Sequence, residues 1–273
     1  MKNNTQALVV DIWSDFVCPW CWIAKHRFEK ALAAFEHKDA VQVRLRAYRI
    51  APNHQAEPIK AALLKKFRDP MAAEGMLYSV QSHGAAEGLD YRFDTMLFGD
   101  TMDAHMLVKA VSDEALQQRL VEVLYAQSIS HGKSLFDRDS LALLAAQAGM
   151  PAEAVQRAWS TPQLRQQVQD DERSASRIAS GVPLFVFGNE THISGAQPQE
   201  VFLQALEKCM PGPRRIWPHR LGKCVAWTAA SSLKRWRQLR WQIPPCPGSR
   251  GPRAPGAAQA TPYPFLPATP QRR

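Results

Sequence analysis

The hydrophobic and polar positions near the N-terminus predict a strand, a helix and a second strand. Leu8 to Trp13 is an almost uninterrupted apolar run, which is typical of a buried central or parallel strand. Cys18 to Phe35 has the spacing of an amphipathic helix. Val41 to Tyr48 alternates apolar with polar side chains, so we predict a second strand there. This order of elements indicates a βαβ unit.

The pattern then changes to helical spacing from Pro58 to about Arg177. The helices expected in this part of the chain cover residues 59–67, 72–83, 101–111, 115–127, 139–148, 153–159 and 161–178. Their succession predicts an all-helical insertion of about 120 residues.

Strand signals return near the end of the helical block. Leu184 to Phe187 and Thr191 to Ile193 flank a tight turn, which predicts a hairpin, and Pro198 to Lys208 reads as a closing helix. The whole order predicts an α/β, thioredoxin-like fold with an all-helical domain inserted in its middle. The expected thioredoxin-like domain comprises residues 7–57 and 179–208, and the expected insertion comprises residues 58–178.

The net charge of +9 is unevenly distributed along the chain. Residues 209–273 hold 12 of the 34 Lys and Arg residues, none of the 25 Asp and Glu residues and 12 of the 20 prolines. The preceding part holds 22 basic and 25 acidic residues, a net charge of −3. The basic charge therefore belongs to a Pro-rich tail, and it gives no reason to expect nucleic-acid binding by the folded part.

Three interpretations of the tail, expected to be disordered, stay open. It is a basic arm for nucleic acid or acidic membranes, a linker with a partner motif, or the product of a frameshift or read-through past about Lys208. The third is our hypothesis, because four tryptophans in a segment without acidic residues differ from usual disordered composition. The coding DNA tests this hypothesis. If the alternative reading frame past Lys208 does not encode a continuation of the closing helix, the hypothesis fails.

The N-terminal residues and the hydropathy of the chain predict a cytoplasmic protein without membrane contact. Met1 to Ala7 do not resemble a secretory signal, and no segment approaches the roughly 20 apolar residues of a membrane span. Cytoplasmic thiols are mostly kept reduced, so closely spaced cysteines in that compartment rarely form structural disulfides.

Cys18-Pro19-Trp20-Cys21 lies between the first strand and the first helix, and it predicts a dithiol redox site. Thiol–disulfide exchange needs an attacking thiolate and a second thiol that resolves the mixed disulfide. We expect an exposed Cys18 to attack, because the helix N-terminus favours its anionic form, and a more buried Cys21 to resolve. Pro19 and Trp20 are expected to set the ring geometry and the relative stability of the two redox states.

A structural zinc half-site is the alternative for the same motif. Zinc usually takes four ligands from two paired motifs. The remaining cysteines, Cys209, Cys224 and Cys246, stand singly in the tail. The sequence therefore favours redox chemistry and predicts no metal.

Gly181-Val182-Pro183 directly precedes the predicted strand at residues 184–187. In a thioredoxin-type fold this loop faces the two cysteines, and we expect the Val182–Pro183 bond to be cis. The alternative is an ordinary trans proline at the first position of a strand. A cis proline here leaves the backbone of Val182 free to pair with a bound peptide or thiol, so Pro183 joins the expected catalytic residues.

Together these motifs resemble the FrnE-like branch of the DsbA family. The resemblance covers about residues 7–208 and includes the segments Phe98 to His105 and Ser194 to Pro198. It implies dithiol–disulfide oxidoreductase activity, as an oxidase or isomerase, on protein or small-molecule thiols. It also implies that no organic cofactor is required.

The same superfamily contains enzymes resembling 2-hydroxychromene-2-carboxylate isomerase and kappa-class glutathione transferases. Those typically carry a serine where Cys18 stands. The resemblance implies that Val182 and the turn from Ser194 to Gln197 stand where those enzymes hold glutathione. Glutathione is therefore a candidate co-substrate. The alternative functions are a glutathione-dependent isomerase or transferase and a non-enzymatic holdase that uses the insertion. Relatives are commonly dimers, so a homodimer is a candidate assembly.

Two further polar residues have weaker signals. His105 begins a predicted helix in the insertion, which covers the active-site face in this fold, and it is a candidate for steering substrate or thiolate. The alternative for His105 is an exposed first helical turn. Asp15 precedes Cys18 by three residues, and we expect it to cap the helix rather than transfer protons.

Overall fold

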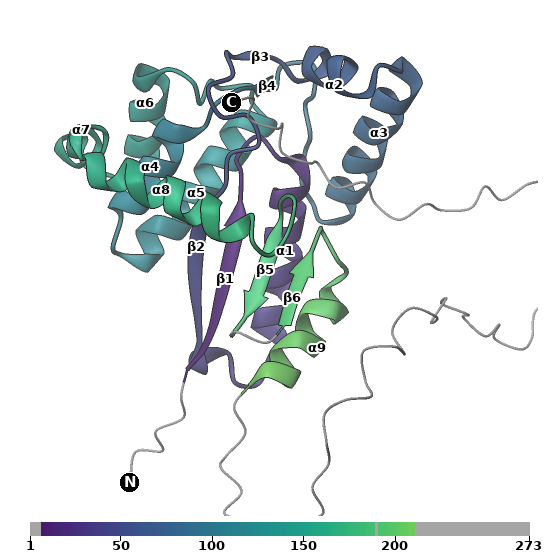
Figure 1. Cartoon of the computed structure of the whole chain (residues 1–273), viewed down its shortest axis with the longest axis vertical. Helices are drawn as coiled ribbons and strands as arrows, with labels where there is room; N and C mark the ends of the chain where they lie inside the picture. Colours follow the sequence, from purple (N-terminus) through teal and green to yellow (C-terminus); the bar gives the residue numbers. More distant parts are fainter. Residues whose placement is uncertain (1–6, 189–190, 211–273) are drawn as a thin grey trace, which may run out of the picture. The chain divides into compact units, whose positions relative to one another are not determined.

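The computed structural model describes residues 7–188 and 191–210 (Figure 1). The expected tail lies outside the described residues beyond Met210, and so do its cysteines Cys224 and Cys246. Within the described ranges, no helix combines the length and the apolar character needed to cross a membrane.

A four-stranded sheet with the order β2–β1–β5–β6 forms the centre of the fold. Strand β1 (Leu8–Ser14) pairs in parallel with β2 (Val41–Ala47) and antiparallel with β5 (Leu184–Phe187). Strand β5 in turn pairs antiparallel with β6 (Thr191–Ser194). Helix α1 (Pro19–Ala34) connects β1 with β2. The predicted βαβ unit and hairpin are therefore confirmed.

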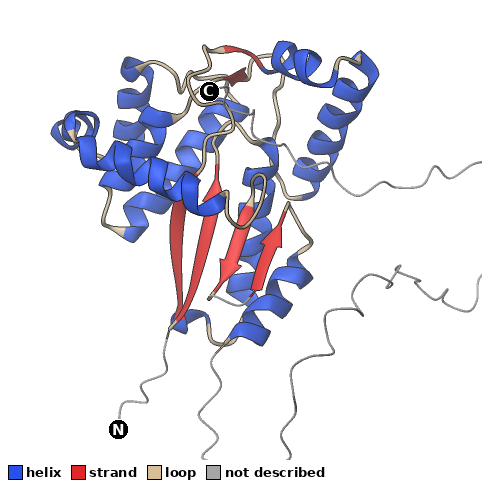
Figure 2. Ribbon diagram, in the orientation of Figure 1, coloured by secondary structure: helices blue, strands red, loops and turns tan. Residues whose placement is uncertain are grey.

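Side chains of β1 alternate between the two faces of the sheet, as the two-residue period of a strand requires. Ile12 lies toward α1, where it lines a cavity with Phe28. Trp13 points to the opposite face, and its indole N–H donates a hydrogen bond of 2.9 Å to the carbonyl of Asp171. Asp171 belongs to α8 (Pro162–Ala175), so helices cover both faces of the sheet (Figure 2).

Four phenylalanines join the sheet to the helices on the α1 face. Phe185 and Phe187 of β5 contact Phe28 of α1, with ring centroids 5.4 and 6.2 Å apart. Phe202 of α9 (Gln199–Cys209) completes the cluster at 4.6 Å from Phe185. All four side chains are buried, so this cluster anchors the closing helix beside α1.

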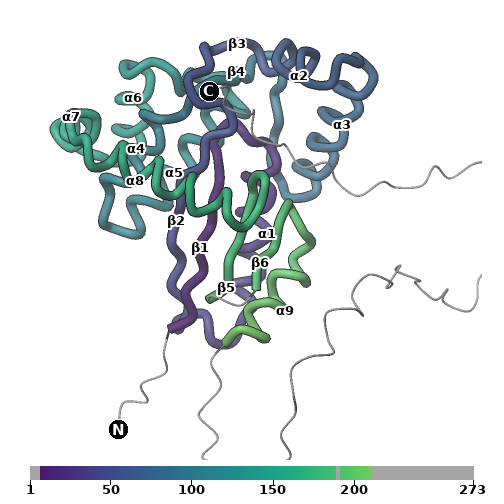
Figure 3. Tube along the Cα trace, in the orientation of Figure 1, coloured from purple at the N-terminus to yellow at the C-terminus, as the bar shows by residue number. Residues whose placement is uncertain are grey.

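The predicted helical insertion is present, and the tube in Figure 3 follows it from β2 to β5. Its helices are α2 (Ile59–Phe67), α3 (Pro70–Ala86), α4 (Met102–Ala110), α5 (Glu114–Ile129), α6 (Arg138–Ala148), α7 (Ala152–Ser160) and α8. The insertion is not entirely helical, however, because β3 (Glu57–Pro58) pairs antiparallel with β4 (Leu97–Phe98). Strands of two residues are too short to show a period of alternation.

Aspartates begin three of these helices, which explains where the helical spacing starts. The side chains of Asp69, Asp113 and Asp137 accept hydrogen bonds from backbone N–H groups in the first turns of α3, α5 and α6. Helix α6 ends at Gly149, whose φ of 96° is a left-handed conformation that glycine adopts without strain. Gly149 is the helix end expected from the sequence.

Candidate active site

The two cysteines lie at the start of α1, as predicted. Cys18 is the N-cap residue with extended backbone angles, and Pro19 occupies the first helical position, where its missing N–H is not needed. The backbone N–H of Cys21 donates a hydrogen bond of 3.0 Å to the carbonyl of Cys18. Both side chains are free thiols. The helix start therefore presents two thiols within one turn.

Cys18 is completely buried, so the expectation of an exposed nucleophile is wrong for this structure. Cys21 is only 2% exposed. The Cys18 thiol lies against the Val182 loop, and its Sγ donates to the Val182 carbonyl at 3.7 Å. Trp20 is also buried, and its ring lies 5.4 Å from that of His83 on α3. Contacts from distant parts of the chain, which no local pattern reveals, thus close over the motif.

The Val182–Pro183 bond is cis, as expected. The carbonyl of Pro183 accepts a hydrogen bond of 2.9 Å from the N–H of Gly195, which holds the next turn against this loop. Gly195 has φ of +83°, which favours glycine. Ser194 ends β6 directly before it, paired with Leu184. The fold thus gathers the motif cysteines, the Pro183 loop and the Ser194 turn at one place.

Electrostatics distinguish the two thiols. Burial is the main cause that raises the pKa of Cys21 well above its ordinary value, and a hydrogen bond with Cys18 adds to it. Cys21 therefore stays protonated until it reacts. Burial lowers the pKa of Lys66 on α2, and the negative charge of Cys18 acts in the opposite direction. The insertion thus brings a cation within electrostatic reach of Cys18, which the sequence pattern did not identify.

Two buried tyrosines from the insertion were also missed. The hydroxyl of Tyr91 donates to the carbonyl of Pro19 at 2.6 Å, and that of Tyr125 donates to the carbonyl of Asp15 at 3.3 Å. Burial raises the pKa of both phenols, and negative charge on the motif cysteines raises it further. Both phenols therefore act as hydrogen-bond donors to the backbone around the motif.

Asp15 does not cap α1, so that expectation is wrong. Its carboxylate is fully buried and turns toward other parts of the chain. One oxygen accepts from the N–H of Ile50 at 2.6 Å, and the other accepts from the hydroxyl of Thr101 at 2.7 Å. Thr101 belongs to the segment Phe98 to His105 that strengthened the family resemblance. This segment therefore lies behind the start of α1.

His105 is 4% exposed, so the alternative of an exposed helical turn is wrong. Its Nε2 lies 3.7 Å from an oxygen of Asp15, and its ring centroid lies 4.8 Å from that of Phe16. Both contacted residues belong to the loop that directly precedes the cysteines. Its role toward substrate or thiolate stays a prediction.

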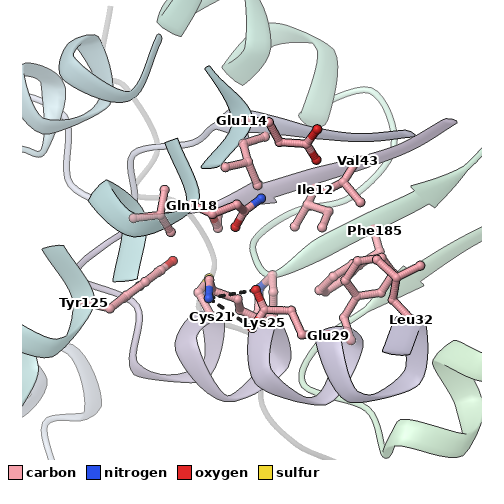
Figure 4. Close-up of a pocket in the computed structure, with 15 residues that line it drawn as sticks. Ile12, Cys21, Lys25, Glu29, Leu32, Val43, Glu114, Gln118, Tyr125 and Phe185 are labelled. Carbon is pink, nitrogen blue, oxygen red and sulfur yellow. Dashed lines mark hydrogen bonds and ion pairs between the residues drawn. The ribbon is translucent and has the colours of Figure 1, made fainter. Parts of the chain in front are cut away.

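A cavity of about 220 Å³ reaches the motif between α1, the sheet and α5 (Figure 4). Cys21 and Pro183 are among the residues that line it, and Ile12 and Phe185 contribute apolar side chains. Lys25 projects from α1 into the same region, where it pairs with acidic side chains. In the described part of the chain, no group of three or more His, Cys, Asp or Glu side chains is arranged to hold a metal ion. The expected absence of a metal and of a required organic cofactor stays a prediction.

Comparison with known proteins decides the family. The sequence model of the DSBA-like thioredoxin domain matches residues 9–207. The chain belongs to the DsbA family. The match spans the sheet, the insertion and the closing helix, so it covers the whole of the site. The resemblance given by the motifs is confirmed for this family.

Several relatives of this DsbA-family chain are known. The probable DsbA oxidoreductase SCO1869 from Streptomyces coelicolor has a crystal structure with 35% sequence identity and a TM-score of 0.70, over 80% of this chain and 95% of its own. The uncharacterized protein YwbO from Bacillus subtilis (strain 168) is 24% identical over 210 residues, which are 72% of this chain and 94% of YwbO. The cytosolic disulfide reductase DsbM from Pseudomonas aeruginosa has the same fold, with 18% identity and a TM-score of 0.52, over 73% of this chain and 97% of DsbM. These neighbours agree with the FrnE-like branch.

Proposed function

We propose that this DsbA-family chain is a cytoplasmic thiol–disulfide oxidoreductase in which Cys18 attacks and Cys21 resolves. The contact between Cys18 Sγ and the Val182 carbonyl, beside the cis Pro183, carries the proposal. This contact sets the thiol next to backbone groups with which a bound peptide or thiol would pair. The burial of Cys21 supports its role, because a protonated second thiol waits until the mixed disulfide has formed.

In the reductive direction, the Cys18 thiolate attacks one sulfur of a substrate disulfide. A Cys18–substrate disulfide forms, and the other substrate sulfur leaves as a thiolate that takes up a proton. Cys21 then loses its proton and attacks Cys18 Sγ, which forms the Cys18–Cys21 disulfide and releases the second substrate thiol. Two electrons pass from the protein to the substrate, and the oxidative direction is the reverse.

We propose glutathione or an extended peptide as the substrate that reaches this buried thiol. Arg27 supports such a site, because it donates a hydrogen bond of 2.7 Å to the carbonyl of Ala196 and so fixes the turn beside Pro183. A structure of DsbM from Pseudomonas aeruginosa with GSH gives a precedent for glutathione within this fold. The cytoplasmic location and a homodimer are part of the proposal, and cell fractionation and light scattering of the purified chain test them.

Cysteine variants separate this proposal from its alternatives. With glutathione disulfide, Cys21→Ala is expected to accumulate a Cys18–glutathione adduct that intact-protein mass spectrometry detects, and Cys18→Ser to form none. The matched control is Cys209→Ala, which removes the partly exposed cysteine at the end of α9 and should leave exchange unchanged.

Undiminished turnover by Cys21→Ala without an adduct would contradict the dithiol mechanism. That outcome would favour a glutathione-dependent isomerase or transferase, because such chemistry needs Cys18 alone. Cys18→Ser also tests the holdase alternative. If this variant suppresses aggregation of a model substrate as well as the wild type does, the insertion has a non-enzymatic activity.

A further inference from the structure

His105 and Asp15 form a buried pair directly behind the dithiol. Both side chains are at least nine-tenths buried, and His105 Nε2 has no hydrogen-bond partner among the described residues. Nε2 lies 3.7 Å from Asp15 Oδ1, which is beyond the length of a hydrogen bond. Buried polar nitrogens are nearly always hydrogen-bonded, so this unpartnered atom facing a carboxylate needs an explanation.

Asp15 is tied to both cysteines. Its carbonyl accepts a hydrogen bond of 3.1 Å from the N–H of Cys18. Burial is the main cause that raises the pKa of Cys21; a backbone hydrogen bond from Asp15 lowers that pKa, and the negative charge of the Asp15 carboxylate raises it. Whatever neutralises this carboxylate therefore makes it easier for Cys21 to lose its proton.

The other charged groups around His105 already have partners. Arg46 of β2 and Lys109 of α4 line the small cavity beside His105, and both form ion pairs with Asp171 of α8. Tyr125 of α5 stays neutral, because burial and nearby negative charges raise its pKa well above the ordinary value. Among the described residues, His105 is thus the one basic side chain within 4 Å of the Asp15 carboxylate.

We propose that His105 is a positioning residue whose protonation offsets the charge of Asp15 and so assists the resolving step at Cys21. The inference rests on the proposed function, since it concerns the step in which Cys21 attacks the mixed disulfide. An imidazole changes its charge between about pH 5 and pH 8. A protonated imidazole neutralises the Asp15 carboxylate 3.7 Å away, whereas beside a neutral imidazole the carboxylate charge opposes the loss of the Cys21 proton.

The resolving step balances without an added reactant. The Cys21 S–H proton passes to water, and the electron pair left on the sulfur forms the bond to Cys18 Sγ. The Cys18–substrate S–S bond breaks at the same time, and the released substrate thiolate takes up a proton from water. His105 keeps its own proton through this step, so it acts only through the charge of Asp15.

The test measures the resolving step in the full chain. The Cys18–glutathione mixed disulfide is formed with glutathione disulfide, and glutathione release is followed from about pH 5 to about pH 8. The ratio of the wild-type rate to the His105→Gln rate is expected to be about tenfold near pH 5, the effect of one pKa unit on the thiolate fraction, and to fall to about one near pH 8. Taking a ratio removes the pH dependence common to both proteins.

Control variants separate a charge effect from packing. Exposed His131→Gln should leave the pH profile unchanged. In an Asp15→Asn background, His105→Gln should have no further effect on the rate. If His105→Gln fails to fold, His105→Asn takes its place in both backgrounds. A ratio that stays constant across the pH range would overturn the inference and leave His105 a packing role. Absence of any mixed disulfide in the wild type would instead contradict the proposed function, so the two failures are distinguishable.

Discussion

At the scale of single residues, the site depends on hydrogen bonds that reach the motif from distant parts of the chain. The hydroxyl of Tyr91 donates to Pro19, 72 residues earlier in sequence, at a distance of 2.6 Å. Trp22 lies beside it, with ring centroids 5.5 Å apart. A phenol held against the first turn of α1 fixes that turn relative to the insertion.

Tyr91→Phe should therefore reduce the free energy of unfolding by about 1 kcal/mol, since it removes one hydrogen bond and keeps the ring. Urea unfolding followed by circular dichroism measures this difference. The matched control is Tyr78→Phe, because Tyr78 is 74% exposed. Equal stability of the two variants would show that the Tyr91 hydroxyl contributes nothing.

Residues of the candidate site could be predicted from the sequence only where they belong to a recognisable motif. Cys18, Cys21 and Pro183 belong to short motifs, and the structure brings them together. Lys66 and Tyr91 lie in ordinary helical or loop sequence, so only the folded insertion reveals them. The exposure of Cys18 was predicted wrongly for the same reason, because burial is produced by packing between distant segments.

At the scale of elements, an aromatic contact joins the closing helix to the sheet. Phe202 of α9 lies 4.6 Å from Phe185 and 5.9 Å from Phe28, and it is fully buried. The contact therefore joins α9 to both α1 and β5. Since β5 directly follows Pro183, packing at this helix also supports the substrate-facing loop.

Phe202→Ala is expected to reduce the free energy of unfolding by about 3–5 kcal/mol, because it leaves a cavity where a large side chain was buried. The midpoint of urea unfolding should fall while the slope of the transition stays unchanged. Val201→Ala on the same helix, at a position 36% exposed, is the matched control and should change stability by less than about 0.5 kcal/mol. A similar loss in both variants would show that the aromatic contact of Phe202 does not determine the effect.

Elements with a clear period were predictable, and elements without one were not. The strands at Leu8 and Val41 and the helices of the insertion follow from apolar spacing. The pairing of β3 with β4 involves two residues from each strand, so tertiary contacts decide it. Gly99, which directly follows β4, is one such contact. A Cβ at this position would lie 3.0 Å from the ring of Phe136.

At the scale of the whole described molecule, an ionic cluster links the insertion to the thioredoxin-like part. Glu122 of α5 accepts hydrogen bonds from Trp22 at 3.0 Å and from Lys25 at 2.7 Å, both on α1. His26 of α1 lies 3.3 Å from the same carboxylate. One acidic side chain thus fixes α5 along the helix that carries both cysteines.

The pKa of Glu122 makes this link depend on pH. Burial by itself raises the pKa of Glu122. The hydrogen bond to His26 and the charge of Lys25 lower it by more, so the pKa falls from an ordinary 4.5 to about 2. A carboxyl group whose pKa is lower in the folded state stabilises the protein above its unfolded pKa. This stabilisation is lost as the pH falls from about 4.5 toward about 2.

Glu122→Gln should therefore be less stable than the wild type by on the order of 1 kcal/mol at neutral pH, because the carboxylate is 38% exposed and solvent screens the pairs. The difference should vanish as the pH approaches about 2, where the wild-type carboxyl also becomes neutral. Urea unfolding at a series of pH values measures it, with exposed Glu207→Gln on α9 as the matched control. A difference that persists unchanged at the acid end would assign the effect to packing around residue 122 instead of its charge.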